Sequence, residues 1–311
     1  MDVEGLVGVD VDASVSGAGA ITFGAITGTL GTATITANSV TGSFAATTVA
    51  GTTVTATHSG SGNVNLGAIT STTTTTIDAS SLTGELTVDL GAVGTTATVT
   101  TGAGGVTSIT TSNGAATNNN VTFGASNAAN DHVILNATAV GSVDITNFKA
   151  GSVAGDSIDL SNGGIEGRTS QTDILANVDG TTITTATVDL LTVTAAIDLD
   201  TLVDNVIVLS GDFASSGLVE TALETSGSRE ITVGLGFTTD ESSVVVAWDD
   251  GTNSYIGVAT FLDGSTTVAT STAITDGETI DALTVTTLVT LTGVSDVTTL
   301  TVANFGGAFI A

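Results

Sequence analysis

The sequence feature that most constrains the fold is a regular recurrence of threonine-rich runs along the first half of the chain. Five runs begin at Gly31, Gly51, Ser71, Gly94 and Gly114, so successive starts are 20, 20, 23 and 20 residues apart. Threonine alternates with Ala, Val or Ile within most runs, which is typical of a β-strand. A strand-based solenoid has coils of about this length, and each coil pairs with the open edge of the previous one. The recurrence therefore predicts a β-solenoid of the β-roll or β-helix type.

An antiparallel β-sandwich is the alternative, because its strands also recur at regular spacing. Side-chain size favours the solenoid. Aromatic residues make up only 4% of the chain, whereas small β-branched side chains and alanine can fill a narrow interior at normal packing density. Threonine also suits exposed strand positions, since its branched Cβ favours an extended backbone.

The second half of the chain differs in composition and predicts a separate domain. All 3 Lys and Arg residues lie after residue 148, as do the Trp and the Tyr. Asn and Gly at residues 162–164 mark a boundary, so the predicted domains are 1–162 and 163–311. The second domain is expected to be mainly β and sandwich-like.

One short helix and a hairpin are expected in this second domain. Residues 212–227 carry apolar side chains at helical spacing, and Asp212 is the expected N-cap. The sequence Asp-Asp-Gly-Thr-Asn at 249–253 is a turn that joins two strands. Strands are expected at 230–233, 243–248 and 255–259.

The charge of the chain excludes several classes of protein. There are 31 Asp and Glu residues against 3 Lys and Arg, which gives a formal net charge of -28. Binding to nucleic acid needs basic side chains, and an anionic membrane surface repels an acidic protein. The chain has no Cys, so disulfides, thiolate zinc sites and thiol nucleophiles are absent. No stretch approaches the roughly 20 apolar residues of a membrane span, so membrane insertion is not expected.

The sequence predicts a location outside the cell or at its surface, without a cleavable N-terminal signal. The first residues are acidic, whereas a secretory signal starts with a basic segment and an apolar run. The chain also offers few sites for trypsin-like proteases and no oxidisable thiol. A cytoplasmic protein, or a mature chain whose signal was removed, is the alternative.

Three segments resemble a known family of secreted bacterial proteins. Residues 96–123 resemble the glycine-rich calcium repeats of repeats-in-toxin proteins, in degenerate form. Residues 144–151 and 156–161 are similar to the segment that follows those repeats. Residues 204–305, including DNVIVLSGDFASSG and LTGVSDVTTLTVANF, resemble the C-terminal regions of bacterial surface-layer proteins of that type.

This resemblance implies a calcium-stabilised β-roll, assembly into a coat or fibre, and one-step (type I) export that recognises the C-terminus. The apolar residues 302–311 are then expected to act as an export signal or as a strand donated to a neighbour. The chain departs from the family in one respect. It lacks the Gly-Gly-x-Gly-x-Asp nonapeptide, and Gly105-Val106 stand where Asn-Asp would follow Gly102-Ala103-Gly104.

Calcium is the expected cofactor, because most carboxylates have no basic partner and calcium prefers several oxygen ligands. A solvated acidic surface screened by salt is the alternative. The candidate ligands are Asp131, Asp144, Asp156, Asp159, Asp249, Asp250, Asn253 and Asp263.

Enzymatic activity is not expected. The histidines His58 and His132 lack a Gly-x-Ser-x-Gly elbow, and a serine hydrolase needs a histidine base oriented by a carboxylate. Glu85 and Asp89 are the residues that could mimic a glycosidase pair, but sugar platforms usually need more aromatics. Rows of threonine, as in Thr72 to Thr76, suggest one further alternative, an ice-binding face.

The sequence therefore predicts a self-assembling extracellular structural protein that forms a bacterial surface layer or filament with cations at its interfaces. The expected partner is a second copy of the chain, and a cell-surface polysaccharide is a further candidate. A calcium-dependent adhesin that acts as a monomer is the alternative. Strands rich in neutral threonine and free of Pro leave unprotected edges, which favours assembly.

Overall fold

The computed structural model describes residues 1–113, 117–125, 129–136, 141–151, 155–160, 173–174, 190–199, 206–233, 242–261 and 278–306. The chain divides into two compact units. The solenoid unit comprises Met1–Lys149 and Val153–Asp159, and the C-terminal unit comprises Ala150–Ser152 and Leu160–Ala311. The boundary predicted near residue 162 lies outside the described residues.

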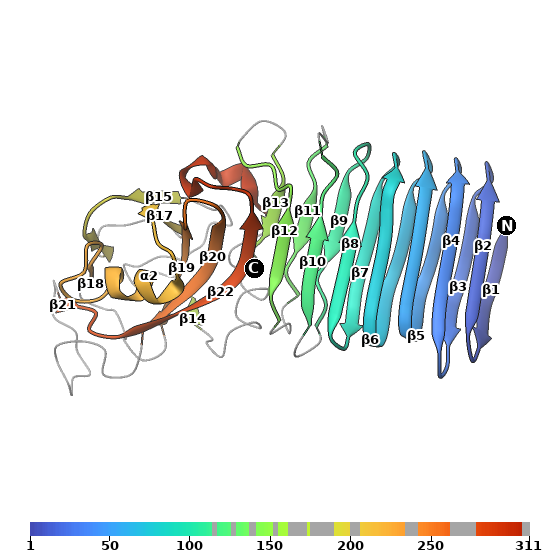
Figure 1. The fold of residues 1–311 in the computed structure, drawn as a ribbon, viewed down its shortest axis with the longest axis horizontal. Coiled ribbons are helices and arrows are strands. Elements are labelled where there is room, and N and C mark those ends of the chain that lie inside the picture. Colours follow the sequence, from blue (N-terminus) through green and yellow to red (C-terminus); the bar gives the residue numbers. More distant parts are fainter. Residues whose placement is uncertain are drawn as a thin grey trace. The chain divides into compact units, whose positions relative to one another are not determined.

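The solenoid unit consists of two parallel sheets (Figure 1). Every complete coil contributes one strand to each sheet. The first sheet contains β1 (Asp2–Gly8), β3 (Ile21–Gly28), the first parts of β5 (Phe44–Gly60) and β6 (Val64–Leu82), β7 (Leu86–Val93), β9 (Thr107–Thr110), β11 (His132–Ile134) and β13 (Ser157–Asp159). The second sheet contains β2 (Val11–Gly17), β4 (Thr32–Val40), the second parts of β5 and β6, β8 (Thr96–Thr100), β10 (Asn118–Thr122) and β12 (Val143–Thr146). The predicted solenoid is confirmed, and the antiparallel sandwich is wrong for this half.

The register refines the predicted repeat. Thr32 pairs with Thr53, Thr53 with Thr74, and Thr74 with Thr96. The coils therefore step by 21, 21 and 22 residues, whereas the starts of the runs suggested 20, 20 and 23. The difference arises because the register shifts after Gly51, and an irregularity of this kind inserts a residue into one strand. The run that starts at Gly114 lies partly outside the described residues.

Alternate residues of each strand form the core of the solenoid. Ile35, Ala56, Ile77, Val99 and Val121 occupy equivalent positions in successive coils of the second sheet, and each is at most 1% exposed. Burying a Val or Ile side chain contributes about 1.5–3 kcal/mol. Each coil therefore depends on its neighbours, because its inward side chains are covered by the coils above and below.

Glycines at one corner of the coils let successive backbones approach closely. A Cβ atom on Gly62 would lie 1.7 Å from the carbonyl oxygen of Gly42, and one on Gly84 would lie 2.3 Å from that of Gly62. No side chain fits at these distances, so the corner requires glycine. These glycines recur at the coil length and belong to the repeat as much as the threonines do.

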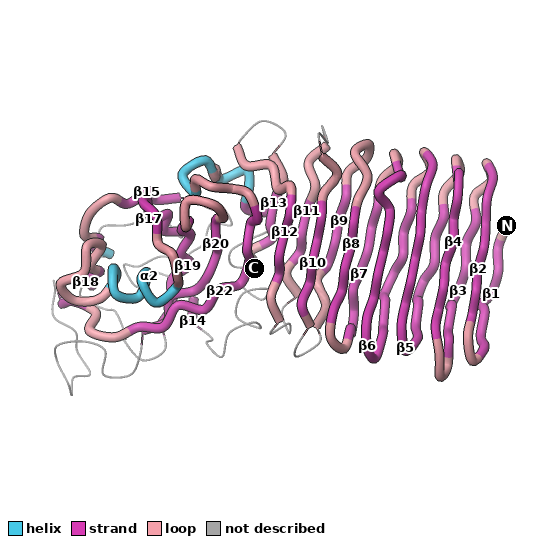
Figure 2. The backbone as a smooth tube through the Cα atoms, viewed as in Figure 1, coloured by secondary structure: helices cyan, strands magenta, loops and turns pink. Residues whose placement is uncertain are grey.

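The C-terminal unit is a mainly β, sandwich-like structure, as predicted (Figure 2). One sheet contains β14 (Asp173–Ile174), β15 (Leu190–Val193), β17 (Val206–Asp212), β19 (Ser242–Asp249), β20 (Ser254–Phe261) and β22 (Leu283–Thr292). A small sheet contains β16 (Ile197–Asp198), β18 (Ile231–Val233) and β21 (Glu278–Thr279). Both sheets contribute to one core around Trp248 and Phe261. Two 3-10 turns, η2 (Val297–Thr299) and η3 (Val302–Asn304), and β23 (Phe305–Gly306) follow.

The helix α2 (Ser216–Leu223) is shorter than the predicted 212–227, and its predicted cap is wrong. Ser215 caps the helix through its side chain, which accepts a hydrogen bond from the N–H of Leu218 at 3.3 Å. A serine hydroxyl satisfies one of the free N–H groups of the first turn. Asp212 instead ends β17. The predicted hairpin is confirmed, because β19 and β20 pair antiparallel around residues 249–254.

Helix α2 also protects a strand. Glu220 Oε1 accepts a hydrogen bond from the N–H of Val285 at 2.8 Å, and Glu224 Oε1 accepts one from the N–H of Leu283 at 3.2 Å. Both donors belong to β22 and are not used in its pairing with β20. Unpaired strand N–H groups attract other strands, so these carboxylates protect this part of the C-terminal unit.

Candidate cation sites and assembly surfaces

Two of the predicted calcium ligands, Asp131 and Asp156, lie next to each other inside the solenoid unit. Thr107, Asp131 and Asp156 occupy the same inward position in three successive coils, a position that Phe44 and Leu86 fill in earlier coils. The Thr107 N–H donates to Asp131 Oδ1 at 2.8 Å, and the Asp131 N–H donates to Asp156 Oδ1 at 3.0 Å. Both aspartates are buried.

The environment of Asp156 disfavours its charge. Its second carboxylate oxygen accepts a hydrogen bond from the N–H of Lys149 at 2.8 Å. Burial raises the pKa of Asp156 to about 6, against the two backbone hydrogen bonds that lower it. The pair of carboxylates thus satisfies backbone N–H groups between coils where the apolar column has ended. Two carboxylates fall short of the several oxygen ligands that calcium takes.

The structure does not bring Asp144 and Asp159 to this pair. Asp144 lies on the outer face of the second sheet beside Asn120, and Asp159 lies on the outer face of the first sheet beside Ile134. Asp159 acts on His132: burial lowers the pKa of His132, and the negative charge of Asp159 partly offsets this effect.

The turn after β19 brings three other predicted ligands together. Asp249 accepts hydrogen bonds from the N–H groups of Gly251 at 3.1 Å and Val297 at 2.9 Å. Asp250 Oδ1 accepts from the N–H of Asn253 at 2.7 Å, and Asp250 Oδ2 accepts from the Tyr255 hydroxyl at 2.6 Å. These side chains therefore hold the turn in shape.

The two aspartates of this turn differ in acidity. Burial raises the pKa of Asp249, and repulsion from Asp212, its partner on β17, adds to the increase. The hydrogen bond from Tyr255 lowers the pKa of Asp250. Asn253 Oδ1 accepts a hydrogen bond from the N–H of Gly293 at 3.0 Å.

Asp263 lies outside the described residues. Within the described ranges, no group of three or more His, Asp or Glu side chains could hold a metal ion. Calcium therefore stays a prediction, and the described residues of one chain do not form a complete shell for it. The same part of the chain contains no helix that is long and apolar enough to cross a membrane.

The candidates for acid–base chemistry are either buried or hydrogen-bonded within the solenoid unit. His58 is 1% exposed, and neither of its ring nitrogens has a hydrogen-bond partner among the described residues. His132 Nδ1 is 2.8 Å from the hydroxyl of Ser157. Glu85 accepts a hydrogen bond from the side chain of Asn63, and Asp89 accepts one from the N–H of Gly91. The two carboxylates support turns of the solenoid.

The first coil of the solenoid has an open edge. Strand β1 pairs with β3 and β2 pairs with β4, and the opposite edges of β1 and β2 pair with no strand in the described part of the chain. Large apolar side chains are exposed at the corner of the first two coils: Val7 is 72%, Val9 62% and Leu30 81% exposed. Unpaired backbone groups and exposed apolar surface therefore coincide.

The outer face of the second sheet carries a regular lattice of threonines. We define the threonine lattice as the three rows of outward positions that β4, the second parts of β5 and β6, and β8 share in register, which are threonine at every position except Asp78. None of these side chains is buried. The positions are Thr32, Thr34, Thr36, Thr53, Thr55, Thr57, Thr74, Thr76, Asp78, Thr96, Thr98 and Thr100.

The outer face of the first sheet lacks this regularity. The equivalent row across its coils is Thr22, Ala45, Asn65, Thr87 and Ser108. Both faces belong to the same fold and have the same spacing between strands. The threonine lattice is therefore a property of one face, and strand preference for threonine alone does not account for it.

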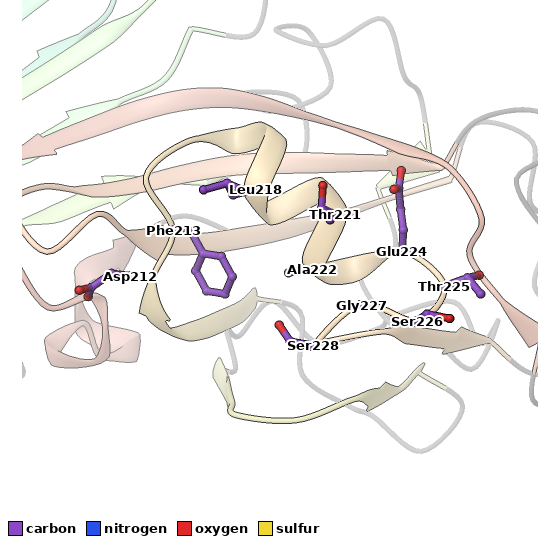
Figure 3. Close-up of a pocket in the computed structure, with 10 residues that line it drawn as sticks. All are labelled: Asp212, Phe213, Leu218, Thr221, Ala222, Glu224, Thr225, Ser226, Gly227 and Ser228. Carbon is purple, nitrogen blue, oxygen red and sulfur yellow. The ribbon is translucent and has the colours of Figure 1, made fainter.

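The C-terminal unit has a recess beside helix α2, with a volume of about 500 Å³ (Figure 3). Its polar side chains largely make bonds within the unit: Thr221 donates to the carbonyl of Gly217 at 2.9 Å, and Glu224 binds the backbone of β22. Leu218, expected on the buried face of the helix, lines this recess and is 51% exposed.

Sequence reasoning missed several of the polar residues that organise the fold. Asp10 Oδ1 accepts a hydrogen bond from the N–H of Thr32 at 2.7 Å, from one coil to the next. The side chains of Asn63 and Glu85 likewise connect adjacent coils. The signal for these contacts is spacing by one coil length, about 22 residues in both cases. Comparisons of the chain with protein-family models, curated proteins and solved structures found no match.

Proposed function

We propose that the protein is an extracellular structural subunit that self-assembles into a bacterial surface layer or filament. The observation that carries this proposal is the open edge of the first coil, where unpaired backbone groups of β1 and β2 lie beside exposed Val7 and Val9. A strand edge of this kind accepts a strand from another chain.

The solenoid supports a mechanical role for the subunit. Coils joined by continuous parallel ladders and a shared core resist bending, because each coil is paired along its length with the next. A second copy that pairs at the first coil would extend the ladder and cover the apolar corner. The exposed side chains there belong to Val7, Val9 and Leu30.

Cations are proposed to stabilise the contacts between copies. Asp2, Glu4, Asp10 and Asp12 lie in the first coil, and the chain as a whole carries a formal charge of -28. Two such surfaces repel each other unless ions screen or bridge them. Calcium that bridges two chains would draw ligands from both, which fits the incomplete ligand sets among the described residues of one chain.

The resemblance to surface-layer and repeats-in-toxin proteins supports the same proposal. It favours export by a route that recognises the C-terminus and a location at the cell surface, where a polysaccharide is a candidate anchor. A structural subunit needs no catalytic group, so we do not propose an enzymatic activity. The competing proposal is a calcium-dependent adhesin that acts as a monomer.

Sedimentation velocity of an edge-blocking variant tests the proposal. Val7→Lys with Val9→Lys places two charges at the open edge, as natural edge strands do. Val302→Lys is the matched control, because Val302 is 52% exposed but lies in the C-terminal unit. We expect the wild type and the control to sediment as large species in calcium, and the edge variant to remain at 30.2 kDa.

Two results would overturn the proposal. A wild type that stays at 30.2 kDa at high concentration with calcium favours the monomeric adhesin. Assembly that persists unchanged in the edge variant excludes the first coil as the contact. A chelator is expected to dissociate the wild-type assembly. If assembly is unchanged by the chelator and by the salt concentration, cations do not stabilise the contacts between copies.

A further inference from the structure

The hydroxyl groups at the centre of the threonine lattice are unused by the protein. Thr34, Thr55, Thr76 and Thr98 form one row across four strands. Each is exposed or half-buried, and none of these hydroxyls has a hydrogen-bond partner among the described residues. The neighbouring row contains Thr36, Thr57, Asp78 and Thr100.

We propose that the threonine lattice is a second functional surface, which adsorbs to ice. The surface is distinct from the open edge of the first coil, so this inference does not depend on self-assembly. The observation behind it is a two-dimensional, almost uncharged array of threonine hydroxyl and methyl groups on one face of a regular sheet. The hydroxyls of Thr32 and Thr53 bond Asp10 and Thr73, whereas those of the central row have no partner among the described residues.

The spacing of the array follows from the fold. Outward residues of one strand are two positions apart, which is about 6.6 Å, and neighbouring strands lie about 4.8 Å apart. Water molecules in the surface layer of a crystal of ice repeat on the same scale. The register across β4, β5, β6 and β8 keeps the rows aligned, so several coils present the same pattern at once.

Rigidity makes such a surface effective. The branched Cβ of threonine restricts its χ1 rotation in a strand. The backbone positions are fixed by pairing on both sides within the sheet. Little conformational entropy is therefore lost when the array binds an ordered partner, because the groups are already positioned.

The charge and chemistry of the face favour ice over other occupants. The protein carries a formal charge of -28, yet Asp78 is the only carboxylate in the threonine lattice. A polyanion finds no basic side chain in the threonine lattice, and a basic partner finds there only Asp78, with Asp12 beside Thr34 on the neighbouring strand β2. The lattice also has no aromatic side chain on which a sugar ring could stack. Free hydroxyls and methyl groups instead match a neutral lattice of hydrogen-bonding water.

Thermal hysteresis and ice shaping of the purified full chain test the inference. The lattice variant is Thr55→Tyr with Thr76→Tyr, which places two large rings on exposed central positions. The matched control is Thr22→Tyr with Thr87→Tyr, on exposed positions of the outer face of the first sheet. Tyrosine is a good strand residue, and circular dichroism melting of both variants checks that the fold is kept.

We expect faceted ice crystals and measurable hysteresis for the wild type and the control, and at least a tenfold loss for the lattice variant. The measurements are repeated with Val7→Lys and Val9→Lys present, so that an assembled state does not hide the face. Absence of hysteresis in this unassembled protein overturns the inference, and so does equal activity of the lattice variant and the control. If the lattice variant instead abolishes self-association, the face is a contact between copies and the ice proposal is wrong.

Discussion

Replacement of His58 by leucine should stabilise the solenoid unit, which is unusual for a fully buried position. The imidazole is 1% exposed, and its two nitrogens have no hydrogen-bond partner in the described part of the chain. The centroid of its ring lies 5.2 Å from the centroid of the Phe44 ring, within the apolar core. Leaving a buried polar group unsatisfied costs about 1–3 kcal/mol, so His58→Leu should raise the free energy of unfolding by about this amount at pH 8.

The advantage of the leucine variant should grow in acid. Burial lowers the pKa of His58 from 6.5 to about 4, so the unfolded chain binds the proton more tightly than the folded chain. The free energy of unfolding of the wild type therefore decreases as the pH falls from about 6.5 to about 4, because protonation of His58 favours the unfolded chain. At 1.36 kcal/mol for each pH unit, the loss below pH 4 is about 3 kcal/mol.

Urea unfolding followed by circular dichroism at pH 8, 6 and 4 measures this difference. His132→Leu is the matched control, because His132 is half-buried and its Nδ1 bonds the hydroxyl of Ser157. We expect no gain at pH 8 from the control. If His58→Leu is less stable than the wild type at pH 8, or if its advantage does not increase toward pH 4, the histidine is hydrogen-bonded in solution and the reasoning is refuted.

Three further predictions concern the carboxylates and the glycine corner. The pKa of Asp156 is raised to about 6 in the folded chain, so its protonation favours folding; the wild type should gain stability over Asp156→Asn as the pH falls from 6 toward 4, and a flat difference in urea titrations would contradict this. Glu220→Ala with Glu224→Ala should cost about 1–3 kcal/mol for each N–H of the buried residues Leu283 and Val285 that is left without a partner, measured by the same method, and an unchanged midpoint would exclude these bonds. Gly62→Ala should lower stability by about 1–3 kcal/mol or more through overpacking, read as a lower melting temperature, and a neutral effect would mean that the coils are further apart than described.

The solenoid could be predicted from the sequence because the same small side chains, mainly threonine, recur in each coil. Threonine runs identified the strands of the second sheet, and the alternation of Ala, Val and Ile with threonine identified which side faces the core. The length of individual coils could not be predicted as well. A register shift after Gly51 leaves no clear mark in a sequence where threonine fills most positions, so the starts of the runs misplace the step by a residue.

The roles of the acidic residues were harder to predict. Their carboxylates predict Asp131 and Asp156 as metal ligands, but the property that places them together is their common position in successive coils. The sequence pattern predicts Asp212 as the helix cap because it precedes the apolar helical spacing, whereas Ser215 lies directly before the first turn and caps it. Local spacing identifies such groups, and only the tertiary fold decides which backbone N–H each carboxylate reaches.

The central claim is that copies of this chain join at the open edge of the first coil. Negative-stain electron microscopy of concentrated protein in calcium, alone and with the Val7→Lys and Val9→Lys changes, tests it most directly. We expect ordered filaments or sheets from the wild type and isolated particles from the variant. Isolated particles from both proteins, or identical ordered arrays from both, would contradict the claim.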